Sequence, residues 1–218
     1  MRLILASASA GRLRLLRQAG FDPEVIISGV DESLFTATDP AELVAALAEA
    51  KAAAVAASVS DGLVIGADSL LDLDGVVHGK PTDSADAERR WAALAGHSGV
   101  LRTGQAVQLV KDGEICGTDV SAAATTVHFG RPDPEELEAY LTSGEPVNVA
   151  GAFTIDGLGG QFIDSLNGDA GTVIGLSLPL LRAQAARLGI RLTDLWRVDS
   201  HPREGHADAT VSQLRGTP

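Results

Sequence analysis

Residues 1–20, MRLILASASAGRLRLLRQAG, decide how the rest of the chain is expected to fold. Leu3-Ile4-Leu5 is a short apolar run of the kind that forms a buried strand. Small residues follow at 7–11, and leucines then recur at helical spacing until Gly20 ends the predicted helix. A strand, a small-residue loop and a helix start with Arg12 in its first turn can together hold a phosphate. The same stretch is also an ordinary strand–loop–helix start with a serine N-cap, and the local sequence leaves both interpretations open.

The composition describes a globular protein and argues against several other classes. Of 218 residues, 45% are hydrophobic and 21% are charged, which is typical of neither a disordered nor a fibrous chain. No apolar stretch reaches the roughly 20 residues that span a bilayer, and Leu3-Ile4-Leu5 is too short for the core of a signal peptide. Cys116 is the single cysteine, so the sequence predicts neither an intrachain disulfide nor a cysteine-based metal cluster. We therefore expect a cytoplasmic protein with no membrane partner.

The net charge of −12 argues against nucleic acid as a partner, because nonspecific binding to nucleic acid depends on a basic surface. If the ligand is a polyphosphate, its charge has to be met locally by a few Lys and Arg side chains together with a divalent cation. The chain has 17 basic residues in all, so each one in an unusual sequence context is informative.

Strands and helices alternate early in the chain, and long hairpins occupy its middle. This order predicts an α/β fold with a mixed sheet, in which two lobes around the shared sheet leave a central cleft. Residues 1–198 form a single domain of two lobes in this interpretation. Residues 199–218 form a polar tail, in which His201 and His206 are expected to be solvated and not metal-bound. The predicted strands are 2–6, 22–28, 63–73, 76–77, 100–110, 114–129 and a glycine-broken 151–164, and the predicted helices are 12–19, 40–58, 84–95, 133–142 and 178–188.

Six ionisable residues stand out along the chain. Lys51 falls in an apolar row of the predicted helix 40–58, where it either reaches out to water or points into a cleft, and we favour the cleft. Asp68 interrupts an apolar strand, where a buried carboxylate needs a cation. Such a set suits a metal–polyphosphate site, because cations hold phosphate oxygens while carboxylates hold Mg²⁺ or Mn²⁺ and activate a water. Taken singly, each could be an ordinary surface charge. The six residues are Arg12, Glu32, Lys51, Asp68, Lys80 and Asp156.

Several motifs together resemble the Maf family, the nucleoside triphosphate pyrophosphatases first named as septum-formation inhibitors. The opening motif of that family, LASxSPRRxxLL, is similar to residues 5–16, LASASAGRLRLL. The resemblance covers residues 3–188, and its matches keep the order and spacing of the family. The further matches are Asp31-Glu32, Glu49-Ala50-Lys51-Ala52, Ile65-Gly66-Ala67-Asp68-Ser69, Gly79-Lys80-Pro81, Ser143-Gly144-Glu145-Pro146, Ala150-Gly151-Ala152-Phe153 and Val173-Ile174-Gly175-Leu176-Ser177-Leu178-Pro179.

The resemblance implies a reaction and a fold. The reaction is hydrolysis between the α and β phosphates of a (d)NTP, which gives a nucleoside monophosphate and pyrophosphate and removes modified nucleotides or surplus ones of the dTTP or UTP type. The fold is a long mixed β-sheet between two α/β lobes, similar to that of inosine triphosphate pyrophosphatases. It also implies a divalent metal cofactor, Mg²⁺ or Mn²⁺. We expect Asp68 to be the general base, acting through a metal-bound water, because a free Asp is a weak base at neutral pH.

The predicted site residues follow from this alignment. Arg12, Lys51 and Lys80 align with the phosphate-binding cations of the family, and Glu32 and Asp68 align with its acidic residues. The predicted catalytic residues are Asp68, Glu32 and Lys51; the predicted metal ligands are Asp68 and Glu32; and the predicted substrate-binding residues are Ser7, Ser9, Arg12, Lys80 and Asp156.

Four positions depart from the family pattern. Gly11 replaces the first arginine of the opening motif, Asn148 and Val149 replace an aspartate and a lysine, and Asp156 stands where the family has glutamine. Two cations are lost and a carboxylate is gained, which should weaken polyphosphate binding unless a metal compensates. The departures leave open a nucleotide-binding regulator of septum formation that turns over little or nothing. A phosphohydrolase that releases orthophosphate is a further alternative. The sequence does not decide the base preference, the metal, or whether the protein is a homodimer.

Overall fold

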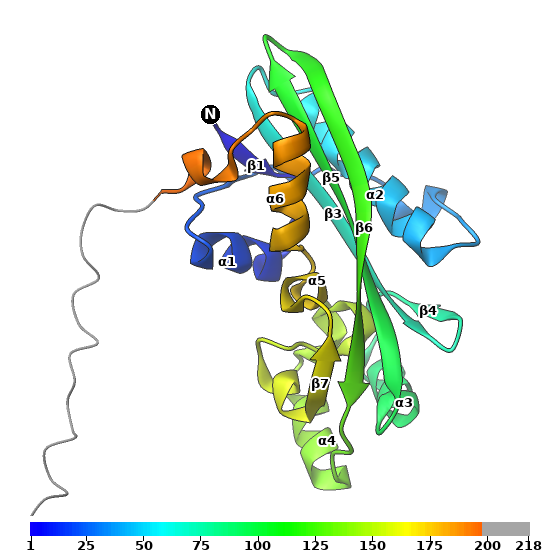
Figure 1. Ribbon diagram of the computed structural model, residues 1–218. Helices are drawn as coiled ribbons and strands as arrows, with labels where there is room; N and C mark the ends of the chain where they lie inside the picture. Colours follow the sequence, from blue (N-terminus) through cyan, green and yellow to red (C-terminus); the bar gives the residue numbers. More distant parts are fainter. Residues whose placement is uncertain (198–218) are drawn as a thin grey trace, which may run out of the picture.

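The computed structural model describes residues 1–197, so the expected tail at 199–218, with His201 and His206, lies outside the described residues. Within this part the chain forms a seven-stranded sheet with helices on both faces (Figure 1). The strands are β1 Leu3–Leu5, β2 Glu24–Val25, β3 Gly62–Leu73, β4 Val76–His78, β5 Ser98–Lys111, β6 Glu114–Phe129 and β7 Ile163–Asn167. The helices are α1 Ala10–Gln18, α2 Pro40–Ala56, α3 Ser84–Leu94, α4 Pro134–Thr142, α5 Ala170–Ile174 and α6 Leu178–Arg187. Short 3-10 turns are η1 Glu32–Leu34, η2 Pro146–Asn148, η3 Ala150–Ala152, η4 Leu158–Phe162 and η5 Leu192–Leu195.

The sheet is mixed, which confirms the α/β fold class predicted from the sequence. Its strand order is β2-β1-β3-β5-β6-β7, and β4 pairs with the far end of β3. β1 is parallel to both β2 and β3, whereas β3, β5, β6 and β7 pair antiparallel in turn. The long β5–β6 hairpin turns at Asp112-Gly113, where both residues have positive φ. Parallel pairing is therefore confined to the N-terminal part of the chain, where helices separate the strands.

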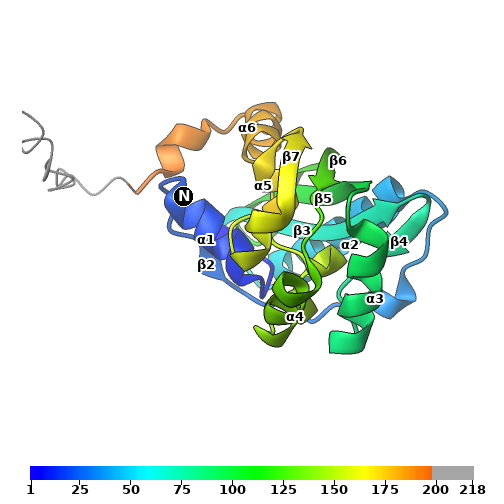
Figure 2. The ribbon, with the colours of Figure 1, turned by 90° about the horizontal axis from the view of Figure 1, so that it is seen from below.

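Two layers cover the sheet at the end that carries β1. Side chains alternate between the two faces of a strand, so neighbouring residues of β1 and β3 enter different cores. One core lies under α1 and α6, and the other lies under α2; Figures 1 and 2 both show β3 between α1 and α2. The first core contains Leu3, Leu5, Leu16, Phe21, Leu63, Ile65, Val107, Leu109, Leu176, Leu181, Ala185 and Leu195, and the second contains Ile4, Ala6, Ala48, Ala52, Val55, Ala56, Val59, Val64, Ala106 and Val110.

The opposite end of the long strands has a separate core under α3 and α4. Trp91 of α3 is fully buried there, and its indole Nε1 donates to the carbonyl of Ala152 at 2.8 Å. The rings of Phe129 and Tyr140 pack edge-on against it. β3 enters this core through Leu71 and Leu73, so residues 66–70 in its middle lie between the cores.

Two glycines bring α2 very close to the sheet. A Cβ on Gly66 of β3 would lie 2.1 Å from the carbonyl oxygen of Ala48, and one on Gly104 of β5 would lie 2.0 Å from that of Val44. Real side chains cannot approach backbone this closely, so α2 can occupy this position only over glycine. Lys51, a predicted site residue, belongs to α2. The close contact therefore sets the height of Lys51 above the sheet.

One predicted element is wrong: residues 151–164 do not form a broken strand. They form η3 and η4, and β7 begins only at Ile163. Gly151 and Ala152 have positive φ, which is incompatible with an extended strand. The backbone N–H groups of Leu158 and Gly159 donate to the carboxylate of Glu145, at 3.0 and 2.9 Å, and so are not free to join a sheet.

The remaining elements agree closely with the prediction, with two smaller differences. The strand predicted at 22–28 is limited to Glu24–Val25, and the short helix α5 was not predicted. No described helix is both long enough and apolar enough to cross a membrane.

Candidate active site

The middle of β3 has a paired strand on one edge only. β5 pairs with residues 62–72 of β3, but β1 pairs with residues 63–65 and β4 with residues 71–73. Within the described part of the chain, residues 66–70 therefore face an edge where no strand is paired. Because side chains alternate along a strand, Asp68 contacts the α2 side here and Ser69 contacts the α1 side. A ligand at this edge can meet polar groups from both faces.

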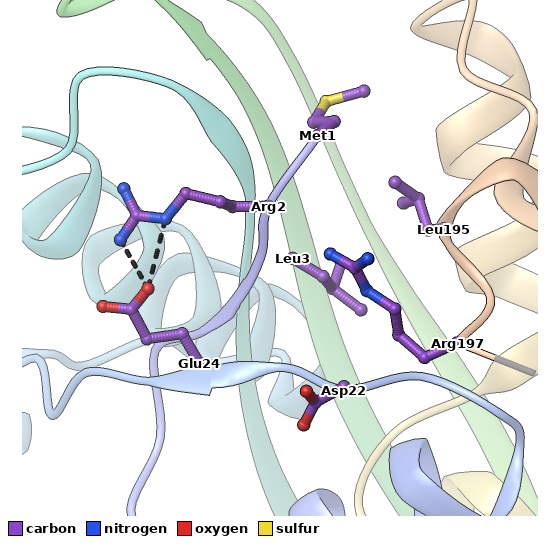
Figure 3. A pocket seen from close by; sticks show the side chains of 7 residues that line it. All are labelled: Met1, Arg2, Leu3, Asp22, Glu24, Leu195 and Arg197. Carbon is purple, nitrogen blue, oxygen red and sulfur yellow. Dashed lines mark hydrogen bonds and ion pairs between the residues drawn. The ribbon is translucent and has the colours of Figure 1, made fainter. Parts of the chain in front are cut away.

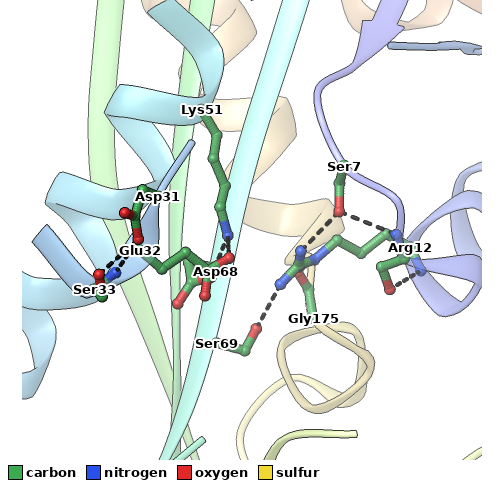
Figure 4. A network of polar contacts seen from close by, with 10 residues as sticks. Ser7, Arg12, Asp31, Glu32, Ser33, Lys51, Asp68, Ser69 and Gly175 are labelled. Atoms are coloured by element: carbon green, nitrogen blue, oxygen red, sulfur yellow. Dashed lines mark hydrogen bonds and ion pairs between the residues drawn. The ribbon is translucent and has the colours of Figure 1, made fainter. Parts of the chain in front are cut away.

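Lys51 connects two carboxylates on the α2 side of this edge. Its Nζ lies 2.6 Å from Oδ1 of Asp68 and 2.6 Å from Oε1 of Glu32 (Figure 4). The side chains of Lys51 and Asp68 are 10% and 11% exposed, whereas that of Glu32 is 58% exposed. The structure thus places Lys51 inward, as we favoured from the sequence, and brings it together with Glu32 and Asp68. The exposed carboxylate of Glu32 leaves this cluster open to solvent on one side.

Burial raises the pKa of Asp68 above its ordinary value. The positive charges of Lys51 and Arg12 oppose this effect, and the negative charge of Glu32 adds to it. Burial of Arg12 lowers the pKa of its guanidinium, and the negative charges of Asp68 and Glu32 oppose this decrease. The two cations and two carboxylates therefore interact electrostatically across β3, although they occupy opposite sides of the strand.

A short turn presents Glu32 to Lys51. Asp31 caps η1, and its Oδ1 accepts hydrogen bonds from the Ser33 backbone N–H at 3.0 Å and from the Ser33 hydroxyl at 2.7 Å. This Asx-type turn fixes the backbone on both sides of Glu32. The Asp31-Glu32 pair noted in the sequence consequently has a division of roles, because Asp31 shapes the turn and Glu32 makes the ion pair.

Arg12 lies on the α1 side of the open edge, which is the unpaired edge of β3 at residues 66–70. Three segments accept hydrogen bonds from its guanidinium. Nη1 donates to Ser7 Oγ at 2.9 Å, Nη2 to Ser69 Oγ at 3.1 Å, and Nε to the carbonyl of Gly175 at 2.7 Å. Figure 4 shows Arg12 and Ser7 on one side of β3, with Lys51 and Glu32 on the other. Arg12 is 9% exposed, so its orientation is fixed by these contacts and not by solvent.

The two serines of the opening loop have different structural roles. Ser7 is buried, and its Oγ also accepts the backbone N–H of Ser9 at 3.2 Å. Ser9 is the N-cap of α1, and its Oγ accepts the backbone N–H of Arg12 at 3.4 Å. The N-cap interpretation of this loop is therefore confirmed for Ser9, while Ser7 belongs to the Arg12 contacts.

Lys80 and Asp156 do not join these contacts among the described residues. Lys80 is exposed and follows β4, and its backbone carbonyl accepts from Arg90 Nη2 at 3.2 Å. The register of β4 on β3 runs from Val76 opposite Leu73 to His78 opposite Leu71, so the chain leaves β4 toward the open edge. Asp156 instead forms an ion pair with Arg14 of α1.

The donor set fits a divalent cation that is shared with a ligand better than one held by the protein alone. Residues 1–197 contain no group of three or more His, Cys, Asp or Glu side chains placed to hold a metal. Asp68 and Glu32 supply two carboxylates, and Mg²⁺ is commonly held by one or two carboxylates together with substrate phosphates and water. The residues present therefore suit a metal that arrives with a polyphosphate.

Two cavities elsewhere in the described chain do not contain the predicted site residues. One is about 110 Å³ and is lined by Arg2, Glu24 and Arg197 among others (Figure 3). There Arg2 forms an exposed ion pair with Glu24. The other is about 340 Å³ and lies between α6 and η5, next to Trp196. Neither cavity adjoins the open edge of β3.

Sequence reasoning missed three groups that hold Arg12 in place. Ser69 was noted only as part of a motif. Thr103 of β5, whose Oγ1 lies 2.8 Å from Ser69 Oγ, was not considered. The carbonyl of Gly175 has no side-chain signal at all. Strand alternation offered one clue, since the neighbour of a site residue on a strand faces the opposite layer. The pairing of Ser69 with Thr103 depends on the β3–β5 register, which the sequence does not specify.

The fold and the site together define an α/β protein with cations and carboxylates gathered at an unpaired strand edge, an arrangement suited to a phosphate-bearing ligand. The chain belongs to the Maf-like protein family, whose model matches residues 2–188.

Similar proteins carry a common name. A protein of Streptomyces coelicolor named nucleoside triphosphate pyrophosphatase is 56% identical over 198 residues, covering 89% of this chain and 94% of the relative. A protein of the same name from Streptomyces avermitilis is 51% identical over 205 residues, covering 93% and 96%. Another, from Nocardia farcinica, is 50% identical over 209 residues, covering 92% and 97%.

Proposed function

We propose that this chain is a nucleoside triphosphate pyrophosphatase that hydrolyses the bond between the α and β phosphates of (d)NTPs, giving a nucleoside monophosphate and pyrophosphate. The class of enzyme follows from the family and from the names of the relatives. The observation that carries the proposal is the position of Lys51, whose Nζ lies 2.6 Å from both Asp68 and Glu32 across β3 from Arg12. This position supports acid–base chemistry and phosphate binding at the unpaired edge of β3.

The cations hold the triphosphate in this proposal. Arg12 offers N–H groups to phosphate oxygens from the α1 side, supported by the hydroxyl of Ser7, while Ser9 fixes the helix start. Lys80 approaches from the end of β4, and its exposed side chain is free to turn toward the ligand. We place Asp156 at the rim of the same site, where its ion pair with Arg14 sets the position of the loop between η3 and η4.

Asp68 is the proposed general base. Burial raises its pKa, which makes it a stronger base than an ordinary aspartate, because a base works best when its pKa lies nearer the working pH. The positive charge of Lys51 opposes that rise, and Lys51 also offers a cation to a phosphate oxygen. Glu32 and Asp68 are the proposed ligands of Mg²⁺ or Mn²⁺. When bound, such an ion neutralises phosphate charge and makes water more acidic.

The substrate binds between the two ends of the sheet in this proposal. Separate cores lie under α1 and α6 at one end and under α3 and α4 at the other, and the site residues of β3 lie between them. This arrangement supports the two-lobe architecture with a central cleft that the family resemblance implies. We propose modified nucleotides, or surplus ones of the dTTP or UTP type, as the substrates.

The test is pyrophosphate release from a panel of ordinary and modified nucleoside triphosphates, with and without Mg²⁺ or Mn²⁺. We expect metal-dependent release that falls at least about 100-fold in Asp68→Asn, in line with the loss of a general base. Asp72→Asn is the matched control, because Asp72 lies on the same strand and pairs with Arg102 at 3.7 Å, away from Lys51. Wild-type turnover in Asp68→Asn would remove Asp68 as the base.

A nucleotide-binding regulator of septum formation remains the alternative, and the departures at Gly11, Val149 and Asp156 favour it. It predicts nucleotide binding without turnover on the whole panel. Release of orthophosphate in place of pyrophosphate would instead indicate a different phosphohydrolase.

A further inference from the structure

A chain of hydrogen bonds runs from Arg12 into the interior through two hydroxyl groups. Arg12 Nη2 donates to Ser69 Oγ at 3.1 Å, Ser69 Oγ lies 2.8 Å from Thr103 Oγ1, and Thr103 Oγ1 donates to the carbonyl of Thr172 at 2.8 Å. Thr103 is on β5 and is fully buried. The chain therefore links an arginine at the open edge to a side chain that no ligand can reach.

The direction of each hydrogen bond in this chain follows from its end point. A carbonyl oxygen can only accept, so Thr103 uses its single hydroxyl proton on Thr172. At the contact between the two hydroxyls, Ser69 must then be the donor and Thr103 the acceptor. Ser69 has no proton left, and its oxygen accepts the N–H of Arg12. Thr103 thus sets the orientation of the Ser69 hydroxyl.

The C-terminal end of α5 also contacts Arg12 directly. Nε of Arg12 donates to the carbonyl of Gly175, the C-cap residue of α5, at 2.7 Å. Carbonyls in the last turn of a helix lack partners within the helix, so they are free to accept from side chains. Arg12 and Thr103 both use this property, and the contacts form a closed ring through Arg12, Ser69, Thr103 and α5.

Ser7 and Ser69 consequently differ, although both accept from Arg12. Ser7 Oγ accepts two hydrogen bonds, from Arg12 Nη1 and from the Ser9 backbone, so its own proton remains free to donate to a phosphate oxygen. Ser69 has already committed its proton to Thr103. A guanidinium carries five N–H donors, and three are used here, which leaves two for a ligand.

We propose that Thr103 is a positioning residue for phosphate binding: through Ser69 it fixes the plane of the Arg12 guanidinium, so that the two remaining N–H groups point to the ligand. This inference rests on the proposed function for the identity of the ligand, since it assigns Arg12 to the phosphates. It concerns a residue that never touches the substrate and acts only through Ser69 and Arg12.

The test compares three variants in the full-length chain. Thr103→Val keeps the shape of the side chain but removes the hydroxyl, and Thr103→Ser restores the hydroxyl. Thr125→Val is the matched control, because Thr125 of β6 is 1% exposed and donates to the carbonyl of Asp169 at 2.9 Å, outside the Arg12 contacts. Thr103→Val and Thr125→Val each lose one hydroxyl-to-carbonyl hydrogen bond next to α5, so this part of the destabilisation is matched.

Two readouts separate positioning from stability. Calorimetric titration with inorganic pyrophosphate measures phosphate binding without turnover, and steady-state kinetics on a nucleoside triphosphate gives KM and kcat. We expect Thr103→Val to weaken pyrophosphate binding about 5- to 20-fold and to raise KM similarly, in the range of a lost hydrogen bond that orients a charged group. We expect Thr103→Ser and Thr125→Val to stay within about twofold of wild type, because each keeps the Arg12 contacts.

Pyrophosphate binding in Thr103→Val equal to that in Thr125→Val would overturn the proposal, as would a failure of Thr103→Ser to restore binding. If the wild type binds pyrophosphate but hydrolyses no triphosphate, the proposed function fails, and the positioning role is decided by the pyrophosphate affinities alone. If Thr103→Val does not fold, Ser69→Ala replaces it, because Thr103 then keeps its bond to Thr172. The same weakening is expected for Ser69→Ala, and unchanged binding would overturn the proposal.

Discussion

The Nζ of Lys51 lies 2.6 Å from Oδ1 of Asp68, and both side chains are about nine-tenths buried. The two residues come from different elements, α2 and β3, which are held together where Gly66 lets the helix backbone touch the strand. Neither charge would be tolerated alone at this depth, because a buried ion without a partner costs several kcal/mol. The pair therefore links the packing of α2 to the chemistry that we propose for Asp68.

Breaking this pair should destabilise the protein more than losing a surface pair does. Lys51→Met leaves the Asp68 carboxylate without its closest cation and should lower the free energy of unfolding by about 2–4 kcal/mol, whereas Lys51→Met/Asp68→Asn should recover about 1–3 kcal/mol of that loss. Urea unfolding of both single variants and the double variant measures the coupling. Arg2→Met is the control, since the Arg2–Glu24 pair is half exposed and should contribute under about 1 kcal/mol. Strictly additive effects at Lys51 and Asp68 would contradict this view of the pair.

Gly66 should be intolerant of any side chain. Gly66→Ala places a Cβ 2.1 Å from the carbonyl oxygen of Ala48, so α2 has to move away from the sheet. We expect the free energy of unfolding to fall by at least about 3 kcal/mol, which is the upper end of the usual cost of overpacking. The cost is high because the new Cβ meets backbone atoms, which cannot move aside as a flexible side chain can. Thermal and urea unfolding would measure this loss. Gly79→Ala serves as control, because its Cβ would lie 3.7 Å from Leu70, an ordinary contact. Equal stability of the two variants would show that α2 does not depend on Gly66.

Glu145 should make the stability of the protein depend on pH in the acid range. Burial of its carboxylate would raise the pKa, but hydrogen bonds from Thr154, Gly159 and Leu158 outweigh this, so the pKa lies below its ordinary value of 4.5. A lowered pKa means that Glu145 stabilises the fold above pH 4.5 and that this stabilisation is lost as the pH falls through the folded-state pKa.

Glu145→Gln is therefore expected to melt below wild type at neutral pH, with the gap in Tm shrinking as the pH is lowered below 4.5. Melting curves over a pH series measure the gap. Glu138→Gln, an exposed substitution on α4, should follow wild type at every pH. A constant gap for Glu145→Gln across the series would count against a lowered pKa.

Asp156 should matter more for substrate than for stability. Its ion pair with Arg14 joins partly exposed side chains, so Asp156→Asn should change the unfolding free energy by less than about 1 kcal/mol. If the pair positions the loop at the rim of the site, Asp156→Asn and Arg14→Gln should shift KM in the same direction by a similar factor. Steady-state kinetics on both variants tests this. Unchanged KM in both would remove Asp156 from the proposed substrate-binding residues.

The sequence predicted the fold wherever local pattern and packing agree. The apolar run of β1, the leucine spacing of α1 and the long β5–β6 hairpin all have clear periodicity, and the structure confirms each. Residues 151–164 differ from the prediction, because their apolar composition suggests a strand that does not form. The decisive contact there is made by Glu145, whose carboxylate accepts hydrogen bonds from the backbone N–H groups of Leu158 and Gly159. These two groups therefore cannot pair in a sheet. That contact joins segments separated by a loop and leaves no periodic signal.

Part of the candidate site was also predictable. Lys51 and Asp68 were singled out because each places a charge in an apolar pattern, and the structure pairs them. The contacts of Arg12 were not predictable, since Ser69 and Thr103 meet only through the β3–β5 register and Gly175 contributes a backbone carbonyl. The Arg14–Asp156 pair likewise spans 142 positions along the chain, beyond the reach of any local pattern.

The most direct test of the central claim is ³¹P NMR of the products formed from a nucleoside triphosphate in the presence of Mg²⁺ or Mn²⁺. Cleavage between the α and β phosphates predicts signals of nucleoside monophosphate and pyrophosphate that grow together, and that are lost in Asp68→Asn but kept in Asp72→Asn. Nucleoside diphosphate with orthophosphate, or a full set of triphosphate signals after prolonged incubation with every nucleotide tested, would contradict it.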